Sequence, residues 1–270
     1  MTIAGNIVTK DLVCGGGLPA FLAAPAGAGK TGAVVLMHER YGLVKHTRDL
    51  AERFAREGFV CLAPDFFYKH PDQDALHRGD ANCDVSDPDA VIALGAAIDA
   101  LQTIPQADTA RLAIMGICQT GRLPLVVAAS RPIAAALVWY GAAQPREWAV
   151  NAKYPRPLDE IIAAVDCPVL GMFGETDHLI SIEDIRRFRD CLERHGKSYD
   201  IHVYRDAPHG WLNDTMPGRY RRTQAEAAWA HQRAFLARVL APGYDRSTRM
   251  QHYAADLAVD YDFSRNVRHE

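Results

Sequence analysis

A cysteine in a glycine-flanked turn is the first residue of the chain whose setting could do chemistry. Cys118 lies in Gly-Ile-Cys-Gln-Thr-Gly (116–121), after the apolar run RLAIM (111–115) and before a stretch that predicts a helix over 122–130. The pattern G-x-C-x-T-G is a cysteine version of the nucleophile elbow G-x-S-x-G. A thiol at a helix N-terminus is favoured as the thiolate, and free backbone N–H groups there can stabilise an oxyanion. We therefore predict that Cys118 is a nucleophile, the alternative being a buried cysteine in a tight turn.

An acid and a base follow in the order that such a nucleophile requires. Asp177 comes just past the apolar run 169–173, and His209 lies in the loop between the run 199–204 and the last helix. His209 would transfer the proton, and Asp177 would hold the correct tautomer and stabilise the imidazolium. Glu175 is a competing acid, and a lone loop histidine is often only a surface residue. The coincidence of three groups, in order and each at a strand end, favours a Cys118–Asp177–His209 triad.

The elements that must position these residues alternate along the chain. Short continuous apolar runs predict strands buried on both faces. Expected strands lie at 33–37, 59–63, 111–115, 133–139, 169–173 and 199–204. Apolar residues at helical spacing predict the helices between them. Expected helices lie at 47–57, 89–101, 122–130, 183–195 and 223–240. This order predicts an α/β fold with a mostly parallel central sheet and helices on both faces.

Two stretches do not follow the alternation. Residues 66–87 are polar and irregular, and they stand where a cap or a substrate-facing loop would be. Residues 241–270 have little periodicity. We therefore expect one α/β domain over 1–240 and a C-terminal extension over 241–270. The extension would lie along the surface and is a candidate contact to a second subunit in a homodimer.

The composition excludes several functional classes. The 270 residues carry a formal net charge of -3, which does not favour a general nucleic-acid-binding surface. No apolar run approaches the roughly 18 residues of a spanning helix, and the first residues lack the pattern of a secretory signal. The six cysteines are scattered without a CxxC pair, which predicts neither a metal site nor a disulfide framework. We therefore expect a cytoplasmic protein with a free thiol, and neither nucleic acid nor membrane as a partner.

Four short segments together resemble the dienelactone hydrolase (carboxymethylenebutenolidase) family of the α/β-hydrolase superfamily. The similarity runs from about Val34 to Leu240. The segments are MHERYG at 37–42, APD at 63–65, the elbow at 116–121, and GETD at 174–177 with HG at 209–210.

The resemblance implies an activity and further roles. Family members hydrolyse small unsaturated lactones, such as dienelactone from aromatic-ring breakdown, without a cofactor. Glu39 matches the family glutamate that faces the thiol and takes part in its activation. The backbone N–H groups of Arg40 and Gln119 match the oxyanion hole. We therefore expect Cys118 to open a lactone through a thioester acyl-enzyme.

The sequence departs from the family pattern at positions that bear on the substrate. Gln119-Thr120 stands where C-x-G-G is usual, and Asn213 stands where an arginine binds the substrate carboxylate. Arg78, Arg122 and Arg40 are candidates to supply that charge for an anionic substrate. Two alternatives therefore stay open. One is a thiol esterase or C–C hydrolase acting on a linear ring-cleavage product. The other is a non-catalytic sensor of a small molecule or a redox state.

Overall fold

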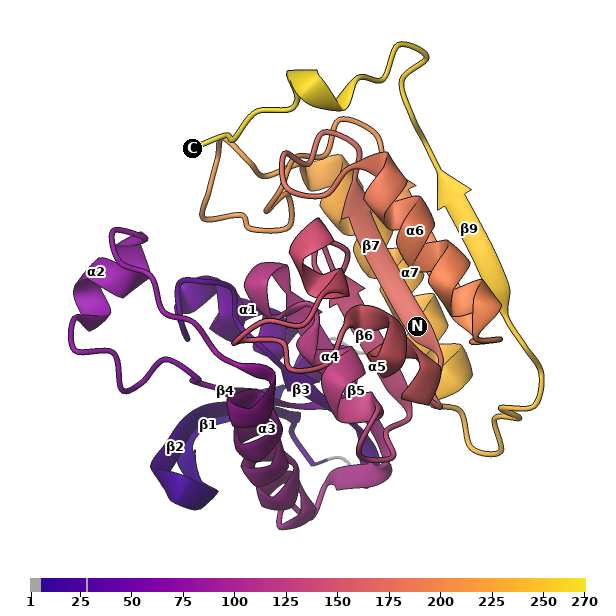
Figure 1. Cartoon of the computed structure of the whole chain (residues 1–270). Coiled ribbons are helices and arrows are strands. Elements are labelled where there is room, and N and C mark those ends of the chain that lie inside the picture. The colour runs from indigo at the N-terminus through magenta and orange to yellow at the C-terminus, as the bar shows by residue number, and fades with distance from the viewer. Residues whose placement is uncertain (1–5, 28) are drawn as a thin grey trace.

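Among the residues that the structure describes, a nine-stranded, mostly parallel sheet forms the centre of the fold (Figure 1). The computed structural model describes residues 6–27 and 29–270. The strand order is β1-β2-β4-β3-β5-β6-β7-β8-β9, with β1 and β2 antiparallel to their neighbours and the others parallel. The strands are β1 (Ile7–Cys14), β2 (Leu18–Pro25), β3 (Thr31–Leu36), β4 (Val60–Pro64), β5 (Ala107–Ile117), β6 (Ala135–Trp139), β7 (Val169–Gly174), β8 (Tyr199–Tyr204) and β9 (Gln251–Ala255).

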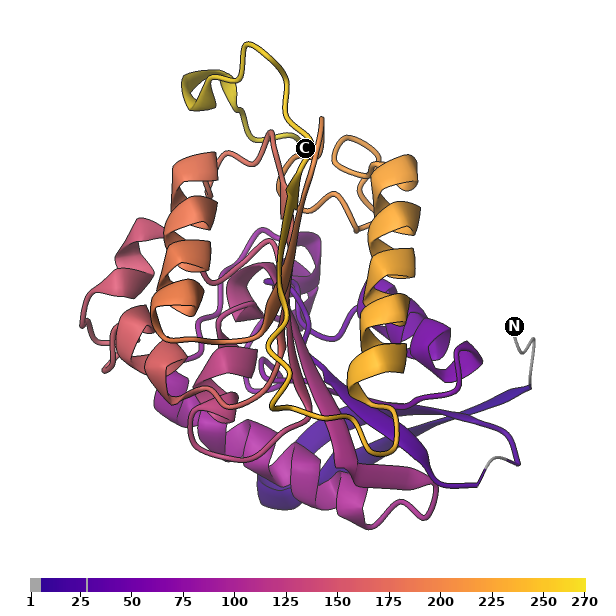
Figure 2. The same cartoon turned by 90° about the vertical axis from the view of Figure 1, so that its right-hand side faces the viewer.

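Helices cover both faces of this sheet. They are α1 (Lys45–Arg56), α2 (Gln73–Arg78), α3 (Asp87–Gln102), α4 (Leu123–Ala128), α5 (Leu158–Ala164), α6 (Ile182–Arg194) and α7 (Arg222–Val239). Short 3-10 turns are η1 (Gly15–Gly17), η2 (Cys118–Thr120), η3 (Pro145–Trp148) and η4 (Phe263–Arg265). Figure 2 shows the sheet edge-on, with α1 and α7 on one face and α3, α5 and α6 on the other. Each face has its own apolar core, one around Phe54 and Trp229 and one around Leu94 and Phe188. The predicted α/β class with helices on both faces is confirmed.

Each strand and helix predicted from the sequence is present, with ends that differ by a few residues. The β1–β2 hairpin was not predicted, because β1 is an exposed edge strand with the polar run Thr9-Lys10-Asp11 and no apolar period. The short helices α2 and α5 were also not predicted. Residues 82–85, at the end of the irregular stretch, line the pocket beside Cys118. Within the described residues, the structure contains no helix that is long and apolar enough to cross a membrane.

The segment after α7 returns to the sheet and then crosses its carboxyl edge. β9 pairs with β8, and the residues after it run over the ends of the strands (Figure 1). The Asn266 side-chain amide donates to the carbonyls of Glu175 (3.1 Å) and Asp177 (2.9 Å). The Ile182 N–H donates to the Tyr261 hydroxyl at 3.2 Å. The predicted extension thus contains a strand that its sequence does not indicate, because QHYAA is short, polar and exposed. Its last residues pack against the loop that carries Asp177.

Candidate active site

Cys118 is the first residue of η2, at the strained turn that follows β5. Its φ is 57°, in the left-handed region that non-glycine residues rarely adopt. The turn is tight enough that a Cβ on Gly116 would lie 2.3 Å from the Thr120 carbonyl oxygen. A Cβ on Gly141, in the loop after β6, would lie 2.5 Å from the Cys118 carbonyl oxygen. These close approaches hold the thiol clear of the sheet, as a nucleophile elbow requires.

Thr120 has a structural role at the position where the family pattern has glycine. Its hydroxyl oxygen accepts from the Ile117 N–H at 3.0 Å and so caps η2. The same hydroxyl lies 3.0 Å from the His38 carbonyl oxygen and can donate to it. This contact ties the elbow to the loop that carries Glu39. The departure at this position therefore has a physical account within the fold.

The structure brings the three residues of the predicted triad together. His209 Nε2 lies 3.0 Å from Cys118 Sγ, and His209 Nδ1 lies 2.8 Å from Asp177 Oδ2. Both His209 and Asp177 are buried. Burial alone would lower the pKa of His209. The charges of Asp177 and Cys118 and the hydrogen bonds to both outweigh this effect, so the pKa lies well above its usual value. The contacts therefore favour the protonated imidazolium of His209 beside Cys118 Sγ.

Asp177 is held by the backbone of the residues that follow it and by the side chain of Asn266. Its Oδ1 accepts the N–H groups of Leu179 (2.7 Å) and Ile180 (3.2 Å), which leaves Oδ2 for His209. The Asn266 amide holds the carbonyl of the same residue. Glu175, the competing acid, instead accepts the backbone N–H groups of Asp206 and Ala258. The structure therefore orients Asp177, and not Glu175, toward His209.

Glu39 is buried beside the elbow, between two donors. The Tyr140 hydroxyl donates to Glu39 Oε1 at 3.2 Å, and the Asn213 side-chain amide donates to Oε2 at 2.6 Å. Burial raises the pKa of Tyr140 well above its usual value, so this hydroxyl keeps its proton. The Tyr140 ring also packs edge-on against His209, with 5.3 Å between centroids. Glu39 and His209 thus share Tyr140 as a neighbour.

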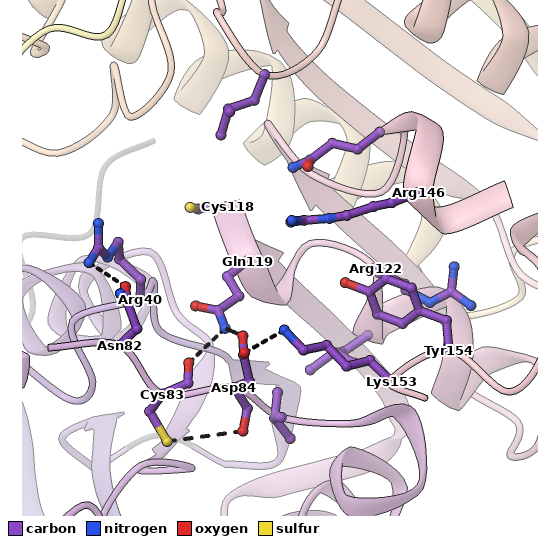
Figure 3. Close-up of a pocket in the computed structure, with 14 residues that line it drawn as sticks. Arg40, Asn82, Cys83, Asp84, Cys118, Gln119, Arg122, Arg146, Lys153 and Tyr154 are labelled. Atoms are coloured by element: carbon purple, nitrogen blue, oxygen red, sulfur yellow. Dashed lines mark hydrogen bonds and ion pairs between the residues drawn. The ribbon is translucent and has the colours of Figure 1, made fainter. Parts of the chain in front are cut away.

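The cavity beside Cys118, called the active-site pocket below, has a volume of about 420 Å³ and several cations in its wall. Arg146, in η3, extends its guanidinium toward Cys118 (Figure 3). Among the described residues it has no ion-pair partner. Lys153 also lines the pocket, but it pairs with Asp84. The Gln119 side chain donates to Asp84 Oδ1 at 2.9 Å and so joins the elbow to the opposite wall. Arg40 also has no ion pair among the described residues, but its guanidinium donates to the Gly79 carbonyl and to the Asn82 side-chain oxygen, so Arg146 is the cation in this wall with the fewest partners.

The three arginines expected to bind a substrate carboxylate, and Asn213 at the position of the family arginine, all have partners within the protein. Arg78 is exposed on α2 and pairs with Asp80. Arg122 is buried and turned away from Cys118 (Figure 3), with two nitrogens on the Asp87 carboxylate. Asn213 donates to Glu39. Arg40 reaches the pocket, but its Nη2 donates to the Gly79 carbonyl at 3.1 Å. The contacts of Arg78 and Arg122 therefore do not favour the role expected for them, and the Asn213 amide is engaged by Glu39.

Sequence reasoning missed the neighbours that complete the site. Tyr140 directly follows a predicted strand, so its position at a strand end was an available signal. Arg146 and Lys153 lie in the irregular segment between β6 and α5, where no periodicity marks a residue as facing the pocket. Only the folded chain brings them beside Cys118.

A cysteine at a strand-to-helix turn, with an aspartate and a histidine at later strand ends of a mostly parallel sheet, defines an α/β-hydrolase. The chain belongs to the dienelactone hydrolase family, whose model matches residues 18–240. It is therefore a hydrolase of the class that acts on lactone or ester bonds.

Individual relatives agree with this assignment. A Methylorubrum extorquens protein named "putative carboxymethylenebutenolidase" is 31% identical over 233 residues, covering 84% of this chain and 78% of that protein. A Bradyrhizobium protein named "probable 2-oxo-3-(5-oxofuran-2-ylidene)propanoate lactonase" is 28% identical over 220 residues, covering 80% of this chain and 88% of that protein. The crystal structure of a "putative dienelactone hydrolase" from Klebsiella pneumoniae has a TM-score of 0.77 at 26% identity, covering 86% of this chain and 99% of that one.

Proposed function

We propose that the protein opens a small unsaturated lactone by attack of the Cys118 thiolate, followed by hydrolysis of a thioester acyl-enzyme. The observation that carries this proposal is the line of contacts from Asp177 through His209 to Cys118, at 2.8 Å and 3.0 Å. At these distances His209 can transfer a proton to and from the Cys118 sulfur without a change in the position of any of the three side chains. The raised pKa of His209 keeps a proton available beside the thiolate.

The chemistry proceeds in two steps. In the first, the sulfur adds to the lactone carbonyl, and the ring carbon–oxygen bond breaks as the thioester forms. A conjugated lactone releases an enolate, which is a good leaving group and takes up the proton of the His209 imidazolium, so that His209 becomes neutral. In the second, His209 accepts a proton from water as its oxygen attacks the thioester, which releases the carboxylate product and restores the thiolate. The backbone N–H groups of Arg40 and Gln119 are the proposed donors to the oxyanion.

An anionic lactone fits the charges of the active-site pocket. Arg146 points toward Cys118 without an ion-pair partner among the described residues, and Arg40 lies on the opposite wall. A guanidinium binds a carboxylate through two parallel hydrogen bonds. The relative from Bradyrhizobium is named for a lactone that carries a carboxylate. We therefore assign substrate-carboxylate binding first to Arg146, and then to Arg40.

A turnover screen with matched cysteine variants tests the proposal. The substrates are cis- and trans-dienelactone beside neutral lactones and linear activated esters. Cys118→Ala should lose roughly 10³-fold or more in kcat, as removal of a catalytic nucleophile does. Cys83→Ala is the matched control, because Cys83 lines the same pocket but does not contact His209. Lactone turnover that survived Cys118→Ala would overturn the proposal.

The same screen separates the alternatives. Cysteine-dependent turnover of linear esters or ring-cleavage products, with no lactone turnover, would favour the thiol esterase or C–C hydrolase. Ligand binding without turnover of any substrate would favour the small-molecule or redox sensor.

Arg146→Gln tests the assigned carboxylate contact. It should raise KM for carboxylate-bearing lactones by about 10-fold, the effect of losing a charge-assisted hydrogen bond, and should leave KM for neutral esters unchanged.

A further inference from the structure

A second cluster of ionisable side chains lies between β8 and β9, outside the active-site pocket. Asp200 and His202 are two residues apart on β8, so they face the same side of the sheet. Asp200 is also directly in register with His252 on β9. His202 Nε2 lies 2.8 Å from Asp200 Oδ1, and His252 Nδ1 lies 2.7 Å from the same oxygen. Two imidazoles from adjacent strands therefore meet at one carboxylate oxygen.

The surroundings of this cluster suit a cation. Within the part of the chain that the structure describes, the ion-pair partners of Asp200 are His202 and His252, and no lysine or arginine is among them. His202 is only 8% exposed, and its ring is stacked on that of His231 from α7 with 4.2 Å between centroids. The Tyr204 hydroxyl lies 2.7 Å from His231 Nδ1 and fixes that ring in turn. The His252 side chain is 54% exposed, which leaves an entry path from solvent.

A second cluster of possible metal ligands differs from this one because an arginine pairs with its carboxylate. Asp159, Cys191 and His195 also place their ligand atoms within 4.8 Å of one another, but Arg194 pairs with Asp159 Oδ2 at 2.6 Å. That guanidinium already neutralises the carboxylate and would repel a metal ion. The ligand atoms of the β8–β9 cluster lie equally close to one another, and among the described residues no arginine or lysine pairs with Asp200.

We propose that Asp200, His202 and His252 bind one divalent transition-metal ion of the Zn²⁺ type. Two imidazole nitrogens and a carboxylate oxygen are a ligand set that Zn²⁺ accepts, with a fourth position for water. At metal–ligand distances of about 2.0–2.1 Å, tetrahedral ligand atoms stand about 3.3 Å apart. The present separations of 2.7 and 2.8 Å must therefore widen by about half an ångström, which the exposed His252 can provide.

The ion would fasten β9 to β8 without touching the reacting atoms. Asp200 stands near the amino end of β8, whereas His209 follows its carboxyl end. β9 begins the segment whose Asn266 holds the carbonyl of Asp177. A metal bond across β8 and β9 would thus stabilise the docked C-terminal segment, and we expect it to raise Tm.

Metal titration of the full chain tests this site. The parent is Cys118→Ala, because the Cys118 thiolate and His209 could themselves bind a metal. After removal of metals with a chelator, equilibrium dialysis against Zn²⁺ should give one bound ion per chain. Co²⁺ should give visible absorption of a four-coordinate site, without the near-ultraviolet band of a thiolate ligand. His252→Ala should weaken binding by more than about 100-fold, since even loss of a group behind a ligand costs 10- to 100-fold.

Thermal unfolding and a second histidine variant separate the loss of a metal ligand from a loss of folding. His252 is exposed, so its alanine variant should fold, with the metal-free Tm of the parent. Zn²⁺ should raise Tm in the parent but not in His252→Ala. His195→Ala alters the other cluster, in which Arg194 pairs with Asp159, and it should bind Zn²⁺ as tightly as the parent does. The proposal fails if the parent binds no ion, or if His252→Ala binds as tightly as the parent.

Discussion

At the residue scale, His209 lies between Cys118 and Asp177. Its Nε2 faces the sulfur and its Nδ1 faces the carboxylate, so a negative charge on either one stabilises the imidazolium. The raised pKa of His209 has its cause in these two charges, which overcome the cost of burial. A change in either charge should therefore appear in the pH dependence of turnover.

Asp177→Asn tests this coupling. The variant removes a charge that raises the pKa of His209, so the imidazolium loses its proton at a lower pH. We expect the alkaline fall in kcat/KM to begin at lower pH than in the parent, and kcat to fall by about 10²-fold or more. Rate profiles from pH 5 to 10 measure both effects. An alkaline limb at the same pH in both proteins would show that Asp177 does not set the charge state of His209.

Glu39→Gln tests whether the buried carboxylate restrains the thiol. A negative charge near Cys118 disfavours the thiolate. We therefore expect iodoacetamide to label Cys118 several-fold faster in Glu39→Gln. Glu175→Gln is the matched control, because Glu175 contacts backbone N–H groups away from the sulfur. Equal labelling of the parent and Glu39→Gln would remove the gating role. A substrate analogue should reduce the difference if substrate binding displaces Glu39.

At the element scale, the elbow depends on the close approach of two turns. The Cys118 turn and the loop after β6 meet at Gly121 and Gly141, where a Cβ on either would lie 2.7 Å from the backbone of the other. A side chain there would push the turns apart and move the sulfur relative to His209.

Gly141→Ala should therefore lower both stability and turnover. We expect a loss of about 1–3 kcal/mol in the free energy of unfolding, the usual cost of overpacking. Gly29→Ala is the control, because nothing lies within 4 Å of the Cβ it would add and its φ is ordinary. Urea denaturation of the two variants measures the difference. A neutral Gly141→Ala would mean that the turns separate without strain.

Strands and helices were predictable from the sequence where a local pattern of apolar residues marks them. The buried parallel strands are continuous apolar runs, and the triad lies at their ends, so both followed from local patterns. The support of Glu39 by Tyr140 and Asn213 joins segments far apart in the sequence, and no local pattern encodes it. β9 is polar and exposed, and it becomes a strand because β8 offers an unpaired edge.

At the scale of the whole molecule, the C-terminal segment is part of the fold of its own chain. β9 covers the edge of β8, and the residues after it hold the loop of Asp177. These contacts are internal to one subunit. The homodimer through this segment remains a prediction, and the mass of truncated chains measures it.

Two truncations separate the roles of this segment. Ending the chain at residue 256 keeps β9 but removes Asn266, so we expect a nearly unchanged fold and a kcat lowered by about 3- to 30-fold, the effect of losing two hydrogen bonds. Asn266→Ala should reproduce that fall, whereas Arg265→Ala, an exposed neighbour in the same turn, should not.

Ending the chain at residue 241 also removes β9 and exposes the edge of β8. That chain should have a lower Tm and should aggregate on heating, because an open strand edge pairs with other chains. Light scattering on all three lengths gives the mass. A fall to half the parent mass in the shorter chains would assign the segment to subunit assembly, and an unchanged Tm at both lengths would contradict its role in the fold.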